Sequence, residues 1–130
     1  MLILIQMFKL VLISSILAHP HVSTYVFPGS PKPANKCFSV YAIHEHNLLM
    51  QDSVQIDVKQ NGTTIFSCWH ALGELCSKPS HFKAKFNLSK RRATFVMPDL
   101  YIVASDMAVG WDARSYGYGK KEYYANSNLC

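Results

Sequence analysis

The sequence lacks an uninterrupted apolar run long enough to cross a membrane. A spanning helix needs about 20 consecutive apolar residues, and the main candidate, residues 1–18, is interrupted by Gln6, Lys9 and two serines. From Met7 onward this segment reads as a charged start, an apolar stretch and a small residue, Ala18, at a cleavage site. We therefore interpret residues 1–18 as a signal peptide that is removed, and we expect no membrane span.

Acidic residues and cysteines are also few. The chain has 8 Asp and Glu against 13 Lys and Arg, so it is mildly basic. Removing residues 1–18 from the 130 leaves 112, the length of one domain. The four cysteines, Cys37, Cys68, Cys76 and Cys130, all follow the expected cleavage point. An even number in a secreted chain predicts two disulfides, for which three pairings exist.

Motifs that would place a catalytic group are missing. The chain has no Gly-x-Ser-x-Gly turn, so its Ser, His and Asp residues do not by themselves indicate a hydrolase. A secreted ribonuclease needs a general acid, a base and a cation for phosphate. Glu45, His46 and Arg92 supply those types, but the sequence does not bring them together. We expect no catalytic residues and no cofactor.

Histidines are the first candidates for metal chemistry. His44 and His46 alternate on an expected strand and therefore share a face, but zinc usually takes three or four protein ligands, and no third one is located. Signal-peptide cleavage would make His19 the first residue, which resembles the histidine brace of copper-dependent lytic polysaccharide monooxygenases, with His70 or His81 as the second histidine. We expect no metal, and a metalloprotein or hydrolase using His19, His44 and His46 is an alternative to a binding protein.

The rest of the chain has the pattern of short strands. Residues 19–36 are rich in proline and predict an extended, loosely ordered leader, and residues 69–76 suit one helical turn. Segments rich in β-branched and aromatic residues are 37–43, 81–88, 93–97, 100–104 and 108–113. This spacing predicts that residues 37–130 form an all-β domain, a small disulfide-stabilised β-sandwich of about six strands with an irregular C-terminal tail.

The clearest local signal is a β-hairpin that joins residues 53–60 to residues 63–69. Asn61-Gly62 lies between them and accepts the positive φ angles of a two-residue type I′ turn. The pairs expected on the core face are Val58 with Ile65, Ile56 with Ser67, and Val54 with Trp69. Trp69 and Trp111 are accordingly interpreted as core residues.

The expected register also bears on the disulfides. It places Cys68 on the face opposite the core. We therefore pair Cys68 with Cys130, and Cys37 with Cys76.

Two segments have the composition of partner-binding surfaces. The densest basic stretch suits an acidic protein, nucleic acid or anionic lipid, or else a solvated edge that discourages strand addition. The tail is rich in tyrosine, which supplies contact area at small entropic cost, or else packs its rings on the sheet. The candidates are Lys83, Lys85, Lys90, Arg91 and Arg92 in the first segment, and Tyr116, Tyr118, Tyr123 and Tyr124 in the second.

Two short motifs match the N-glycosylation acceptor. They are Asn61-Gly62-Thr63 and Asn87-Leu88-Ser89. Asn61 and Asn87 are therefore candidate glycosylation sites, which fits a eukaryotic secretory route.

The order of these features resembles the MAX effectors, the ToxB-like proteins that plant-pathogenic fungi secrete. In that family a cysteine opens the first strand, a hairpin follows, and the partner cysteine precedes the fourth strand of a six-stranded sandwich. Cys37, the Asn61-Gly62 hairpin and Cys76 ahead of residues 81–88 fit this plan, whereas Cys68, Cys130, the leader and the tail lie outside it. The resemblance implies a non-enzymatic protein that binds a host protein through a strand edge or sheet face.

We therefore expect a secreted, extracellular, monomeric binding protein, an effector or virulence factor that acts on an unidentified host protein. No nucleic-acid partner is expected, and translocation into host cells is left open. The histidine-based metalloprotein or hydrolase is the second hypothesis. The third is a carbohydrate- or cell-wall-binding protein that uses Trp69, Trp111 or the tail tyrosines as stacking platforms.

Overall fold

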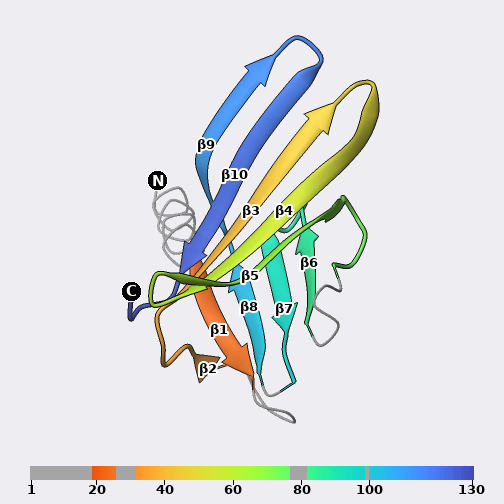
Figure 1. Cartoon of the computed structure of the whole chain (residues 1–130). Helices are drawn as coiled ribbons and strands as arrows, with labels where there is room; N and C mark the ends of the chain where they lie inside the picture. The colour runs from red at the N-terminus through yellow and green to blue at the C-terminus, as the bar shows by residue number, and fades with distance from the viewer. Residues whose placement is uncertain (1–18, 26–31, 77–81, 99) are drawn as a thin grey trace, which may run out of the picture.

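The computed structural model describes residues 19–25, 32–76, 82–98 and 100–130, and within these ranges it contains β-strands and no helix. Ten strands form two five-stranded sheets that pack together (Figure 1). The chain is thus an all-β sandwich, as the strand spacing predicts. The signal-peptide prediction, residues 1–18, lies outside the described residues. No described segment is a helix with the length and apolar character to span a membrane.

The first sheet, called the short sheet below, has the strand order β2-β1-β8-β7-β6. Its strands are β1 (His21–Tyr25), β2 (Lys32–Pro33), β6 (Lys83–Asn87), β7 (Arg92–Val96) and β8 (Tyr101–Ser105). The second, called the long sheet, has the order β5-β4-β3-β10-β9. Its strands are β3 (Phe38–Asn47), β4 (Met50–Gln60), β5 (Thr63–Ala71), β9 (Ala108–Ser115) and β10 (Tyr118–Asn126).

The core lies between the facing sides of the two sheets. Alternate residues of each strand point inward, so β4 buries Val54, Ile56 and Val58 and β7 buries Ala93 and Phe95. The largest fully buried side chains include three phenylalanines, each no more than 2% exposed: Phe38, Phe86 and Phe95.

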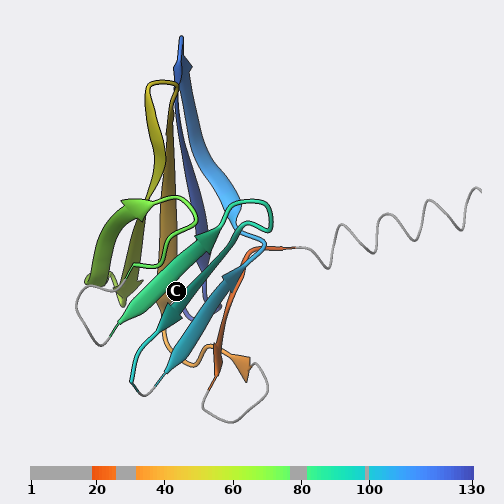
Figure 2. The ribbon, with the colours of Figure 1, turned by 90° about the vertical axis from the view of Figure 1, so that its right-hand side faces the viewer.

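Two hairpins of the long sheet extend beyond the short sheet. Strands β3, β4 and β10 have 9 to 11 residues and β9 has 8, whereas no strand of the short sheet exceeds 5. Figures 1 and 2 show the β3–β4 and β9–β10 hairpins as a narrow blade rising past the region where the sheets overlap. At this distal end the inner face of the long sheet has no second layer over it.

The β4–β5 hairpin forms at Asn61-Gly62, but its expected register holds only next to the turn. Lys59 pairs with Thr64, whereas Val58 pairs with Phe66 and not with Ile65, because a β-bulge shifts the register between them. A shift of one residue moves every later side chain to the other face. Trp69 consequently points outward and is 68% exposed, which corrects its assignment to the core.

The same shift corrects the disulfide pairing. Cys68 lies opposite Ile56 and packs against the core, and it bonds Cys76. Cys37 bonds Cys130. The predicted pairs, Cys68 with Cys130 and Cys37 with Cys76, are therefore wrong. The Cys37–Cys76 bridge on which the resemblance to the MAX effectors rests is not formed.

Both ends of the expected domain are more ordered than predicted. Within the Pro-rich leader, β1 pairs with β8 along its whole length and buries Val22, so the sandwich begins before Cys37. The irregular tail is instead the strand β10, which pairs with β3 and β9. The described residues form ten strands where about six were expected, and β1, β2 and β10 are those outside the segments predicted as strands. Residues 69–76 continue β5 and then turn, without a helix.

Candidate functional site

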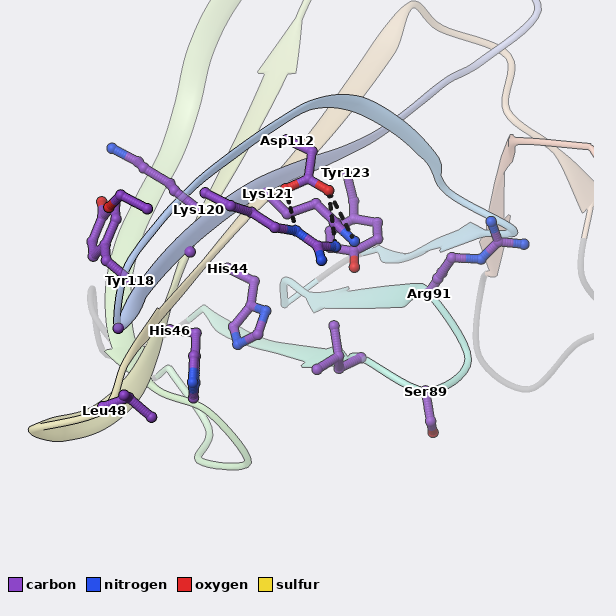
Figure 3. Close-up of a pocket in the computed structure, with 15 residues that line it drawn as sticks. His44, His46, Leu48, Ser89, Arg91, Asp112, Tyr118, Lys120, Lys121 and Tyr123 are labelled. Atoms are coloured by element: carbon purple, nitrogen blue, oxygen red, sulfur yellow. Dashed lines mark hydrogen bonds and ion pairs between the residues drawn. The ribbon is translucent and has the colours of Figure 1, made fainter.

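A cavity lies where the inner face of the long sheet leaves the cover of the short sheet. Along β3 the inward positions change from Phe38, Val40 and Ala42, which are buried, to His44 and His46. A groove of about 620 Å³ separates these histidines from the turn between β6 and β7. Figure 3 shows His44 and His46 on one side of this groove and Ser89 of the turn on the other.

Two histidines and one carboxylate form a cluster on the groove wall. His44 donates from Nε2 to Asp52 Oδ2 at 2.8 Å, and His46 donates from Nδ1 to Asp52 Oδ1 at 2.7 Å. Partial burial alone would raise the pKa of Asp52, but the hydrogen bonds and positive character of both imidazoles outweigh it and lower that pKa below its ordinary value. Asp52 therefore stays ionised at neutral pH and orients both rings.

A second charged cluster lies beside the first, on β9 and β10. Arg114 donates from Nε and Nη2 to the carboxylate of Asp112 at 3.2 and 3.1 Å, and Lys121 Nζ lies 3.5 Å from the same group. The bond from Arg114 lowers the pKa of Asp112, and Asp112 in turn raises the pKa of Arg114. The strand register brings the two clusters side by side, because Asp112 of β9 pairs with Lys121 of β10, and Lys121 pairs with His44 of β3.

The groove combines positive charge with apolar and open surface. Three cations, Arg91, Arg114 and Lys121, line it against one carboxylate, Asp112. Lys120 also borders the groove, but its amine lies 5.8 Å above the Trp111 ring and points away in Figure 3. The apolar part of the groove lining comes from Leu48, Leu88, Tyr118 and Tyr123. Gly117 and Gly119, which have no side chains, leave the groove open.

The structure brings together residues that three separate sequence patterns supplied. His44 and His46 come from the histidine pair, Arg91 from the basic stretch, and Tyr118 and Tyr123 from the tail, and all five line the groove. This convergence depends on β10 pairing with β3, a contact between segments far apart in the chain.

The remaining partner-binding candidates lie elsewhere. Lys83 and Lys85 are exposed on alternate positions of β6, and Lys90 and Arg92 are exposed without lining the groove. Tyr116 occupies the β9–β10 turn, and Tyr124 faces Tyr41 across the β3–β10 pair without lining the groove. The predicted patches are therefore divided by the fold.

Sequence reasoning did not single out Asp52, Asp112, Arg114 or Lys121. A usable signal was present in the tail, where Tyr116-Gly117 is a turn and Gly117 has a φ of 72°. With that turn assigned, Arg114 and Asp112 alternate along one strand and face the partner strand that carries Lys121.

The metal candidates do not converge in the part of the chain that the structure describes. No group of three or more His, Cys, Asp and Glu residues is placed there to hold a metal ion. His19 lies at the start of the short sheet, where its carbonyl accepts a bond from His21 Nδ1 at 2.9 Å. His70 is buried and donates from Nδ1 to the carbonyl of Ala71 at 2.8 Å. His81 lies outside the described residues.

The residues proposed for a ribonuclease site and for carbohydrate stacking do not come together on the fold either. Glu45 alternates with His46 on β3 and so faces the opposite side of the sheet, which separates the ribonuclease candidates Glu45, His46 and Arg92. Trp69 and Trp111 are both exposed, at 68% and 39%, and belong to the two opposite edge strands of the long sheet. Trp111 is thus not a core residue, and the two rings form no common platform.

Both glycosylation candidates are accessible. Asn61 occupies the β4–β5 turn with a φ of 51°, and Asn87 ends β6. Both are exposed. Comparison of the chain with protein-family models, with curated proteins and with solved structures finds no match.

Proposed function

We propose that this chain is a secreted, non-enzymatic binding protein that holds an acidic segment of a host protein in the groove between its two sheets. In this proposal it is an effector or virulence factor. The observation that carries the proposal is the convergence of Arg91, Arg114, Lys121 and two histidines around a single groove. The two disulfides are typical of proteins that fold in an oxidising space and support the secreted part.

The groove chemistry favours a ligand with carboxylates beside apolar side chains. Arg114 presents a planar guanidinium, which suits bidentate carboxylate recognition, and its side chain is 72% exposed although it is paired with Asp112. Leu48, Leu88 and Tyr118 give adjacent apolar contact. A groove bordered by strands on one side and a turn on the other accommodates an extended peptide.

The test is a selection of random displayed peptides on the immobilised protein, followed by anisotropy titration of labelled copies of the enriched peptides. We expect the peptides to be rich in Asp and Glu around an apolar residue. The double variant R114Q/K121Q should bind them roughly tenfold more weakly, because it removes the charge-assisted hydrogen bonds.

The matched control is K83Q/K85Q, which removes the same amount of charge from the exposed face of β6, outside the groove. It should bind the peptides like the unmodified protein. Peptides without an excess of acidic residues, or equal weakening by both double variants, would contradict the proposal.

A further inference from the structure

The far end of the blade carries the most exposed apolar side chains near the groove. Three consecutive residues at the tip of the β3–β4 hairpin, Leu48 and Leu49 of the turn and Met50 at the start of β4, are 67%, 94% and 70% exposed. Tyr116 of the β9–β10 turn is fully exposed. The two turns lie side by side, because the Leu48 N–H donates to the Gly117 carbonyl at 3.0 Å. We call Leu48, Leu49, Met50 and Tyr116 the apex.

Two backbone donors of the apex are already hydrogen-bonded internally. Besides the Leu48–Gly117 bond, the Leu49 N–H donates to the side-chain oxygen of Asn47 at 3.0 Å. A backbone N–H that has a partner within the protein loses little on leaving water, whereas an unpaired one costs several kcal/mol. The apex can therefore enter an apolar medium without exposing these donors to it.

Polar and cationic side chains follow directly behind the apex. Arg114 and Tyr118 are each two residues from Tyr116, and Lys120 is four residues away, so these groups lie about 7–13 Å along the strands from the tip. On the other hairpin the nearest carboxylate, Asp52, is already bonded by His44 and His46. An apolar tip backed by Tyr, Arg and Lys matches the layering of a lipid interface.

The geometry points to a lipid bilayer with anionic headgroups as the occupant of the apex: we propose that Leu48, Leu49, Met50 and Tyr116 insert into the acyl boundary while Arg114 and Lys120 contact headgroup phosphates. The apex is the end of a projecting blade (Figures 1 and 2). A fluid bilayer accepts such a protrusion without a preformed pocket. Arg114 and Leu48 serve both this inference and the acidic-peptide proposal, but Leu49, Met50 and Tyr116 do not line the groove, so variants at these positions test the inference separately.

The experiment is flotation of the natural mature chain with phosphatidylcholine vesicles that contain a minority of phosphatidylserine, compared with phosphatidylcholine alone. We expect binding that is stronger to the anionic vesicles. Leu49→Asp should lower the partition coefficient roughly tenfold or more, because a fully exposed leucine loses its transfer into the bilayer. In addition, Tyr116→Trp should show blue-shifted emission that spin-labelled lipid quenches.

The matched control is Leu129→Asp, the same substitution at an exposed leucine beside the C-terminus. It should float like the unmodified chain, and circular dichroism should show that both variants keep the fold. Equal flotation of the Leu49 and Leu129 variants, or no flotation of the unmodified chain, overturns the inference. So does a dimer in light scattering that Leu49→Asp dissociates, since the apex would then join two copies. Acidic-peptide binding by Leu49→Asp reports separately on the groove.

Discussion

At the residue scale, two carboxylates each contact two basic side chains that line the groove. Asp52 bonds His44 and His46, and Asp112 bonds Arg114 and lies near Lys121. The sequence allowed us to predict that His44 and His46 share a face, because alternation along a strand requires it. It could not locate Asp52, because the β3–β4 register shifts at a bulge between Glu45 and Asn47, next to the turn.

The Asp52 cluster predicts a specific loss of stability in acid. Its folded-state pKa is lowered relative to the ordinary value of 3.8, so the ionised carboxylate stabilises the fold above the unfolded-state pKa, and this contribution is lost as the pH falls through the folded-state value. Urea unfolding of the unmodified chain and Asp52→Asn should therefore differ most at pH values well above 3.8 and converge as the pH falls below 3.8 through the lower folded-state pKa.

The double variant H44A/H46A, which has no side-chain donor at either position, tests whether the histidines cause this behaviour. Without their hydrogen bonds, only the opposing effect of burial on Asp52 remains. In this background acidification should no longer reduce the destabilisation caused by Asp52→Asn. Because burial alone raises the folded-state pKa, the chain that keeps Asp52 should gain stability relative to Asp52→Asn as the pH falls. A gap between the unmodified chain and Asp52→Asn that stays constant from neutral pH to about pH 3 would contradict the role assigned to Asp52.

At the element scale, the sequence predicts the position of the β4–β5 turn but not the register in which the two strands pair. Asn61-Gly62 forms the expected turn, with φ angles of 51° and 81°. The bulge at Ile65 could not be read, because Ile65 and Phe66 are equally suited to an inward position and only packing against the short sheet chooses Phe66. Phe66 contacts the ring of Phe95 across the core, with centroids 4.7 Å apart.

The tail was missed for a related reason. Residues 108–126 contain few strongly apolar inward positions, since β9 is exposed along nearly all of its length and β10 buries only Tyr123 and Ala125. The period-2 signal of a half-buried strand is therefore absent. β10 is held by its ladder with β3, and β9 by its ladder with β10, which no single-segment pattern reveals.

The Asn61-Gly62 turn gives a prediction about backbone strain. A Cβ added at Gly62 meets nothing within 4 Å, so Gly62→Ala tests only the cost of a side chain at a φ of 81°. We expect a loss of about 1 kcal/mol in the free energy of unfolding, measured by urea denaturation. Gly119→Ala is the control, because its Cβ meets only His46 Cβ at 4.0 Å, and it should cause no such loss. Equal effects would contradict the assignment of strain to the turn.

At the scale of the whole molecule, the two disulfides lie away from the distal blade that carries the groove and the apex. Cys37–Cys130 closes the base of the long sheet, where Phe38 N–H donates to Ser127 Oγ at 2.9 Å and Ser127 N–H donates to the Phe38 carbonyl at the same distance. Cys68–Cys76 joins β5 to a bridge with Ala84 of β6, and so ties an edge of the long sheet to an edge of the short sheet. Neither disulfide lies in the distal blade, which is held by its strand ladders and by the Asp52 and Asp112 side-chain clusters.

The two bridges should therefore differ in their contribution to stability. They span sequence separations of 93 and 8 residues, so chain entropy gives about 4–5 kcal/mol for Cys37–Cys130 and about 2–3 kcal/mol for Cys68–Cys76. We expect C37S/C130S to lower the free energy of unfolding more than C68S/C76S in equilibrium urea denaturation. Peptide mapping without reduction should recover Cys37 with Cys130. Cys37–Cys130 also joins the start of β3, the strand that carries both groove histidines, to the chain end beyond β10. Recovery of Cys37 with Cys76 would contradict the pairing, and a larger loss of stability for C68S/C76S than for C37S/C130S would contradict the predicted order of the two bridges.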